Sequence, residues 1–249
     1  MRLLFLLGTC LAALSCVSGD NVPQVRLTIL DWPNVTQIPR PAKPYKPEKP
    51  IGDGIEVKVH ALYDNGFAGE RNQSALEDHF NGIFRKVEEN FHKRYINVTF
   101  KVSGVQQKDG LVVYYEEHLV NGNATLETLK DEADTEMPKQ FNSIFYFFTG
   151  SNVFENKTMH QDGVYTPHTF CTLKPTATVL QSLPDPNFWR TPYKMTSFLF
   201  GSHHSPLPDE DDYQQMNKTF QVSSHGSRTD RSPHQSPRGR PTSCCPESP

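Results

Sequence analysis

The chain has 249 residues, a formal net charge of −3 at pH 7 and 36% hydrophobic residues. It lacks the basic surplus of nucleic-acid-binding proteins, so we expect no nucleic-acid partner. After the first apolar run, no segment approaches the roughly 18 uninterrupted apolar residues that cross a bilayer, so we expect no membrane span. The remainder is long enough for one folded domain.

The N-terminus has the features of a secretory signal peptide. Arg2 precedes the Leu- and Ala-rich run Leu3–Val17, and the small residues Ser18 and Gly19 follow it. The run is short for a transmembrane helix. We therefore predict a signal peptide over residues 1–19, cleavage after Gly19 and a secreted, extracellular product.

Six N-x-[ST] sequons agree with export. Such a tripeptide marks a candidate N-glycosylation site on the surface of a secreted protein. Behind a signal peptide the six predict a glycoprotein, in which two or three of them could be buried or unused. The candidate sites are Asn34, Asn72, Asn97, Asn123, Asn156 and Asn217.

The mature chain is predicted to keep an odd number of cysteines, namely Cys171, Cys244 and Cys245. A disulfide between the adjacent Cys244 and Cys245 is strained, so Cys171 could pair with either of them. The remaining thiol would then be free, pair with another molecule or belong to an abnormal C-terminus.

Residues 20–54 are predicted to be a leader and spacer. Their prolines alternate with basic residues, which is typical of polyproline II chain that cannot pack a core. This stretch is either a stiff linker or a ligand for a proline-binding groove. The folded region is predicted to begin at Ile55, because apolar and polar residues alternate from there to Ala61 as in a half-buried strand.

A long amphipathic helix is predicted next. Ser74 is its candidate N-cap, Glu77 completes a capping box, and apolar residues recur at helical spacing over residues 76–91. A second strand is predicted at Val98–Val102 and a third at Leu111–Tyr115.

The following elements are a helix over residues 124–137, ended by Pro138, and a strand at Ile144–Phe148. The strand is a continuous apolar run, typical of a central strand covered on both faces. Residues 151–189 are predicted to be loops, with a short strand around Gly163-Val164-Tyr165.

The last predicted helix starts with Thr191 as N-cap and Pro192 as first helical residue, and it ends at the C-cap glycine Gly201. The order of elements predicts an α/β fold with a mixed, mostly parallel sheet. The pattern fades after Tyr213, and residues 217–249 are predicted to be a disordered Ser/Pro/Arg-rich tail, either genuine or a translated frameshift. The folded domain is therefore predicted over residues 55–216.

Gly201 and His204 match the second half of the metzincin zinc motif, H-E-x-x-H-x-x-G-x-x-H. In that motif three histidines bind zinc and the glutamate is the general base. His204 then takes the third ligand position, while Lys194, Met195 and Phe198 stand at the first ligand, the base and the second ligand. None of these three replaces an imidazole or a carboxylate. We therefore predict no catalytic residue, no cofactor and a remnant metal ligand at His204.

The order of the elements and their local sequences resemble the reprolysin (adamalysin-type) branch of the metzincins. Ile55–Ala61 is similar to the family's first strand, and Asp78–Val102 is similar to its long helix and second strand. Ser143–Gly150 is similar to the strand ending in Thr-Gly, and Gly163–Cys171 resembles the edge segment leading to a cysteine near the substrate cleft. More narrowly, the chain resembles the secreted salivary metalloprotease-like proteins of ticks, in particular a 28 kDa family of metastriate ticks.

This resemblance implies a metzincin-like three-layer sandwich over about residues 55–216, with Met216 as the candidate for the family's Met-turn. With the zinc motif degenerate, we interpret the chain as a secreted, catalytically inactive glycoprotein that binds an unidentified host extracellular protein during blood feeding. The alternative is an active or weakly active zinc metalloendopeptidase. Its ligands would lie outside the usual pattern, among His160, His168, His203 and His204.

Three weaker hypotheses remain. A small-ligand scavenger, such as a binder of biogenic amines, needs an enclosed apolar pocket with polar anchors. The carboxylates of residues 209–212 form a solvated acidic loop or a calcium site. Cys171 and His168 could form a catalytic Cys/His pair, but the chain lacks a cysteine-protease signature, and a half-cystine is the default in an exported protein.

Overall fold

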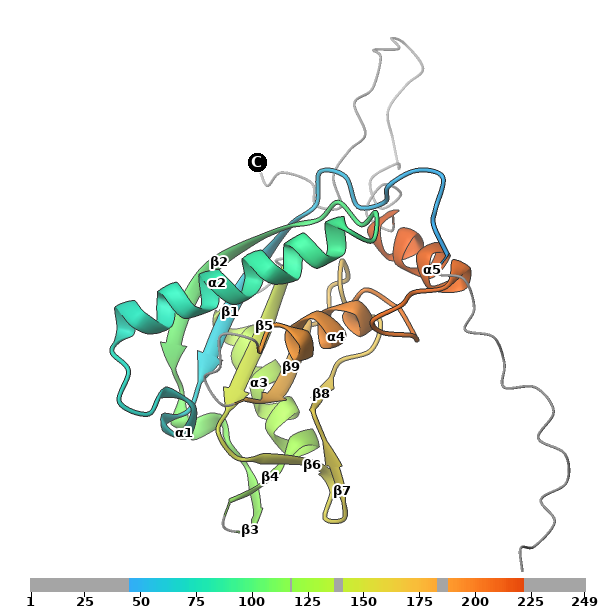
Figure 1. Ribbon diagram of the computed structural model, residues 1–249. Coiled ribbons are helices and arrows are strands. Elements are labelled where there is room, and N and C mark those ends of the chain that lie inside the picture. The colour runs from blue at the N-terminus through green and yellow to red at the C-terminus, as the bar shows by residue number, and fades with distance from the viewer. Residues whose placement is uncertain (1–44, 117, 137–140, 183–187, 222–249) are drawn as a thin grey trace, which may run out of the picture. The chain divides into compact units, whose positions relative to one another are not determined.

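The computed structural model describes residues 45–116, 118–136, 141–182 and 188–221 (Figure 1). The predicted signal peptide, the Asn34 sequon, the adjacent Cys244 and Cys245 and the chain beyond residue 221 lie outside the described residues. Of the helices that the structure describes, none is both long enough and apolar enough to cross a bilayer.

A five-stranded sheet in the order β2-β1-β5-β9-β8 forms the centre of the fold. Four of its strands run parallel, and β8 runs antiparallel to β9. The predicted α/β class with a mixed, mostly parallel sheet is confirmed. The strands are β1 (Glu56–Tyr63), β2 (Thr99–Gln107), β5 (Ser143–Thr149), β8 (Gly163–Tyr165) and β9 (Ala177–Gln181).

A second sheet has four short strands in the order β3-β4-β6-β7. These strands are β3 (Tyr114–Glu116), β4 (Leu119–Asn121), β6 (Asn152–Asn156) and β7 (Met159–Gln161). The helices are α1 (Asn65–Ala68), α2 (Gln73–His92), α3 (Gly122–Glu136), α4 (Arg190–Leu199) and α5 (Glu210–Gln221), with a 3-10 turn at Asp109–Leu111.

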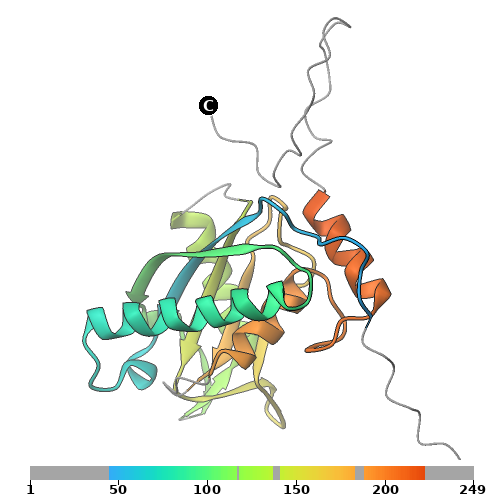
Figure 2. The same ribbon diagram turned by 45° about the horizontal axis from the view of Figure 1, so that its top comes forward.

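Strand β5 separates two hydrophobic cores. All seven of its residues are buried, and successive side chains point to opposite faces of the sheet. Ile144, Tyr146 and Phe148 pack in the core under α2, α4 and α5, whereas Phe145 and Phe147 pack in the core under α3. Figure 2 shows α2 and α4 in front of the sheet and α3 behind it. The three layers therefore follow from one apolar run that is buried on both sides.

The structure differs from the sequence prediction at several strands. Residues 151–189, predicted to be loops apart from Gly163-Val164-Tyr165, also form β6 and β7. Leu111 ends the 3-10 turn, and the strand predicted at residues 111–115 is confined to Tyr114–Glu116 in the small sheet. Strand β9 lies in the region predicted to be loops, although it pairs with β5 in the centre of the sheet. Five residues are too few to distinguish a buried strand from a loop by periodicity.

Helix α2 begins earlier than predicted. Its N-cap is Asn72, whose side-chain oxygen accepts a hydrogen bond from the Ala75 N–H at 2.9 Å, and Ser74 lies inside the first turn. Ser and Asn cap about equally well, so the local sequence could not decide between two candidates two residues apart.

We predict that Asn72→Ala lowers the free energy of unfolding by about 1 kcal/mol, because one backbone N–H of α2 loses its acceptor. Ser74→Ala should change the free energy of unfolding by less than about 0.5 kcal/mol. Urea unfolding of protein from a host that does not glycosylate checks both values. Asn72→Asp keeps a capping oxygen and serves as control; a loss as large as that of Asn72→Ala would contradict the assignment.

The folded unit extends past both predicted boundaries, residues 55 and 216. Ile51 pairs with Ile96, and Tyr45 packs on Tyr213 with 5.4 Å between ring centroids. At the other end α5 continues through Gln221 and buries Phe220 in the core. A Cβ added to Gly52 would lie 3.2 Å from the Phe220 ring and 2.8 Å from Val98, so the predicted spacer and the predicted tail pack together.

Candidate functional site

Helix α4 carries the degenerate zinc motif and ends as predicted at a glycine. Gly201 has φ 103°, a backbone conformation that favours glycine. The Gly201 N–H bonds the Phe198 carbonyl at 3.0 Å, and the Ser202 N–H bonds the Ser197 carbonyl at 2.9 Å. These two bonds form a Schellman motif, which satisfies the last carbonyls of α4 and turns the chain toward His204.

The start of α4 differs from the prediction. The helix begins at Arg190, and Trp189 is an N-cap whose side chain makes no capping hydrogen bond. Thr191 is therefore a helical residue rather than the N-cap. Pro192 still lies in the first turn, where its missing N–H costs no helical hydrogen bond.

The three motif positions on α4 are occupied by structural contacts. The Lys194 ammonium pairs with Asp162 at 3.1 Å, and Met195 is 2% exposed in the core. The Phe198 ring stacks on Tyr165 of β8 with 5.2 Å between centroids. These side chains therefore hold α4 to the edge of the sheet, and they do not fit a catalytic zinc, which needs three nitrogen or oxygen ligands and an open position.

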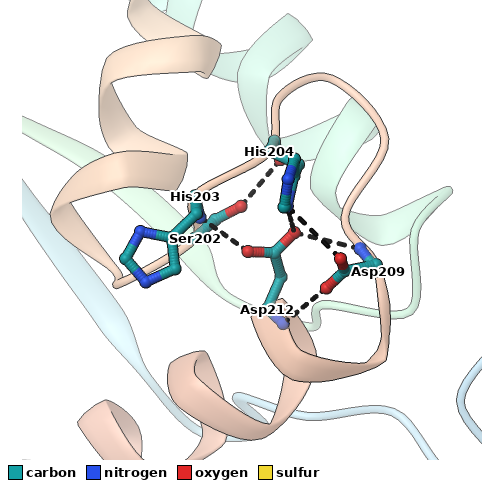
Figure 3. Close-up of polar contacts among 5 residues, drawn as sticks. All are labelled: Ser202, His203, His204, Asp209 and Asp212. Atoms are coloured by element: carbon teal, nitrogen blue, oxygen red, sulfur yellow. Dashed lines mark hydrogen bonds and ion pairs between the residues drawn. The ribbon is translucent and has the colours of Figure 1, made fainter.

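His204 lies beyond α4 in a cluster with Asp209 and Asp212 (Figure 3). Its Nδ1 is 3.1 Å from the nearer Asp212 oxygen and 3.3 Å from an Asp209 oxygen. One ligand atom from each of the three residues lies within 4.8 Å of the other two. His204 itself is mostly exposed, and its ring is a neighbour of carboxylates rather than of other imidazoles.

Asp212 organises this cluster, and the predicted solvated acidic loop is wrong at this residue. Asp212 is 1% exposed, and its two oxygens accept the N–H of His203 at 2.6 Å and the N–H of Asp209 at 3.0 Å. Asp209 accepts the N–H of Asp212 at 3.0 Å in return. Such reciprocal bonds form a capping box at the start of α5. The four acidic residues are therefore mainly a helix N-terminus, which favours negative charge.

The charge of Asp212 is stabilised by its contacts. Burial alone would raise the pKa of this carboxyl, but the N–H groups of His203 and Asp209 and the His204 ring together lower the pKa below its ordinary value. Asp212 is therefore ionised at neutral pH and orients His204. No local pattern in the sequence distinguishes this buried carboxylate from the other three.

The four histidines predicted as alternative ligands do not converge on one point. The rings of His168 and His203 lie together, with 6.1 Å between centroids, and the His203 ring points away from Asp212 in Figure 3. His160 lies on β7 and contacts Gln181 at 2.5 Å. The four predicted ligands therefore fall into separate groups, and of these four His204 is the one that the described contacts place beside carboxylates.

Two further candidates have structural positions. Met216 is completely buried inside helix α5, so it is not placed at a turn as a Met-turn would require. Cys171 is disulfide-bonded, which excludes it as a free nucleophile. Both residues contribute to the core that contains α4.

The sequons differ in exposure. Asn72, Asn123 and Asn156 are exposed, and Asn156 ends β6 at a tight turn. Asn97 and Asn217 are half-buried, and the Asn97 amide donates a hydrogen bond to Asp53 at 2.7 Å. The exposed asparagines offer the most room for a glycan.

No protein-family model matches the chain, and no curated protein matches it. Among solved structures the chain is similar to a chaperone–substrate complex, at 7% identity and a TM-score of 0.48, over 62% of this chain and 24% of that one. It is also similar to metalloproteinase-II from Bacteroides fragilis, at 10% identity and a TM-score of 0.42, over 70% of this chain and 55% of that one. Archaemetzincin from Methanopyrus kandleri is 16% identical with a TM-score of 0.39, over 67% of this chain and 88% of that one.

The chain thus spans about a quarter of the first of these proteins and about half of the second. At these identities and TM-scores the likeness concerns the course of the backbone alone.

Proposed function

We propose that the protein is a secreted, glycosylated, metalloprotease-like domain that does not cleave peptides and acts by binding. The narrower part of the proposal is a reprolysin-like salivary protein of the tick kind, whose partner is a host extracellular protein met during blood feeding. The sequence resemblance supports this narrower part.

One observation carries the proposal of inactivity: the positions of two zinc ligands and the general base are used for packing and for an ion pair. Met195 is buried, Phe198 stacks on Tyr165, and Lys194 brings a positive charge to the first ligand position. A cation at that point opposes metal binding. His204 alone cannot supply the three or four protein ligands of a zinc site.

Secretion and glycosylation are supported by the N-terminal sequence and by the surface positions of several sequons. Asn72, Asn123 and Asn156 present exposed side chains on three different elements. Glycans on those residues would extend from separate elements of the fold.

We predict that the mature protein, secreted from eukaryotic cells and dialysed against a mild chelator, contains far less than one zinc per chain. A ligand that binds the native state raises the melting temperature. Because we expect no zinc to bind, the melting temperature should not change when zinc or a strong chelator is added. Elemental analysis and thermal unfolding measure the two quantities. About one zinc per chain with chelator-sensitive peptide cleavage would overturn the proposal.

A second function, a weakly active zinc metalloendopeptidase, is favoured by one observation. His204, Asp209 and Asp212 provide one nitrogen and two oxygen donors within 4.8 Å of one another. The variant His204→Ala separates the two functions. Zinc and zinc-dependent peptide cleavage that are present in the native protein and lost together in this variant would support the second function, whereas absence of zinc and of cleavage from both proteins supports the first.

A further inference from the structure

We propose that a pocket at the N-terminus of α4 binds a small organic anion with an apolar body. The pocket has a volume of about 430 Å³, which is in the range typical of small-molecule sites. Three segments form it: the end of α2, the start of α4 and the loop after α4. Its lining residues are Asn90, Arg94, Trp189, Arg190, Tyr193, Lys194, Ser205 and Pro206.

The charge of the lining selects an anion. Arg94, Arg190 and Lys194 all line the pocket, and no carboxylate is among the described residues that do. Lys194 is paired with Asp162, but no carboxylate of the described chain pairs with Arg94 or Arg190. Guanidinium groups without a carboxylate partner are suited to binding carboxylate, sulfonate or phosphate groups. The same charges disfavour the biogenic amines considered from the sequence.

The backbone of α4 adds to this preference. A helix N-terminus carries partial positive charge and favours acidic residues, yet α4 has none in its first turn and begins with Arg190. Trp189 supplies no capping hydrogen bond, so the N–H groups of the first turn receive no acceptor from the N-cap side chain. A bound anion would compensate both the arginine charge and these donors.

The rest of the lining suits an apolar or aromatic body. Trp189 and Tyr193 pack edge to face with 6.2 Å between ring centroids. Pro206, on the loop after α4, also lines the pocket. The Arg190 guanidinium lies 5.8 Å from the Trp189 ring, which fixes a cation beside an aromatic face. A ligand with an aromatic or aliphatic body and one anionic head therefore matches both parts of the pocket.

Two hydroxyls of the lining provide an independent observation. The side-chain oxygens of Tyr193 and Ser205 are buried without a hydrogen-bond partner in the described part of the chain. The Ser197 hydroxyl donates its hydrogen bond to the Tyr193 carbonyl oxygen at 2.9 Å. Buried hydroxyls normally have partners, and a polar ligand head with small local adjustment would supply one.

The test is a calorimetric titration of the mature protein with 8-anilino-1-naphthalenesulfonate, an aromatic anion, at physiological salt. We expect one saturable site per chain. The neutral analogue N-phenyl-1-naphthylamine should bind about tenfold more weakly or worse, because it lacks the charged head. Competition with dodecanoate and with dodecyl phosphate then distinguishes a carboxylate from a phosphate as the preferred head.

The variants Arg94→Gln and Arg190→Gln should each weaken binding of the anionic dye by about tenfold. Arg85→Gln is the matched control. Arg85 is an exposed arginine of α2 that does not line the pocket, so its replacement should leave the affinity for the dye within about twofold. Circular dichroism verifies that each variant is folded. Equal binding of the two dyes, or unchanged affinity in both pocket variants, would overturn the proposal. The zinc content does not enter this test.

Discussion

Replacing Phe200 by alanine is expected to lower the free energy of unfolding by about 3–5 kcal/mol, the range for truncating a fully buried phenylalanine. Phe200 is 0% exposed and follows the last residue of α4. Its ring packs on Phe91 of α2, on Phe170 and on Phe220 of α5, with centroids 5.5, 4.8 and 5.1 Å away. The substitution leaves a cavity where three segments meet.

Urea unfolding at neutral pH measures this loss, and Leu207→Ala is the matched control. Leu207 is 52% exposed, so its truncation should stay within about 0.5 kcal/mol of the native protein. A loss below about 1 kcal/mol for Phe200→Ala would mean that α5 does not pack on α4 as described. Phe220 belongs to the segment predicted from sequence to be a tail, so the experiment also tests the revised boundary.

Replacing Asp212 by alanine is expected to lower the free energy of unfolding by about 2–4 kcal/mol, since buried N–H donors lose their acceptor. These donors belong to His203 and Asp209, and the His204 ring loses its partner as well. Asp212→Asn keeps one acceptor oxygen without the charge and should lose less. Asp211→Ala, an exposed neighbour, is the control.

The contribution of Asp212 to the free energy of unfolding should fall on acidification. The pKa of the folded Asp212 is lowered from 3.8, so folding favours the ionised carboxylate. The charge-dependent part of the stabilisation is fully present above the unfolded pKa and is lost as pH falls through the lower folded pKa. The difference between the native protein and Asp212→Asn should therefore be constant near neutral pH and shrink below pH 3.8. A difference that grows on acidification would contradict the assigned contacts.

Several elements could be predicted because their signals are local. The run Ile144–Phe148 is apolar without interruption, and a strand buried on both faces is the result. The apolar residues of α2 recur at helical spacing and form its buried face. Gly201 ends α4 because a positive φ is cheap for glycine. In each case the residues that cause the structure are neighbours in the chain.

The sequence by itself also determined that α4 lacks the ligands and base of a zinc protease, because side-chain chemistry is read directly from residue types. Only the tertiary structure decided which partners the substituted residues found, that β9 completes the sheet beside β5, and that Gly52 packs against Phe220. It also decided that Asp212 alone of four acids is buried and that Arg94 and Arg190 line one pocket. These features depend on contacts between distant segments, and local periodicity carries no information about which segments meet.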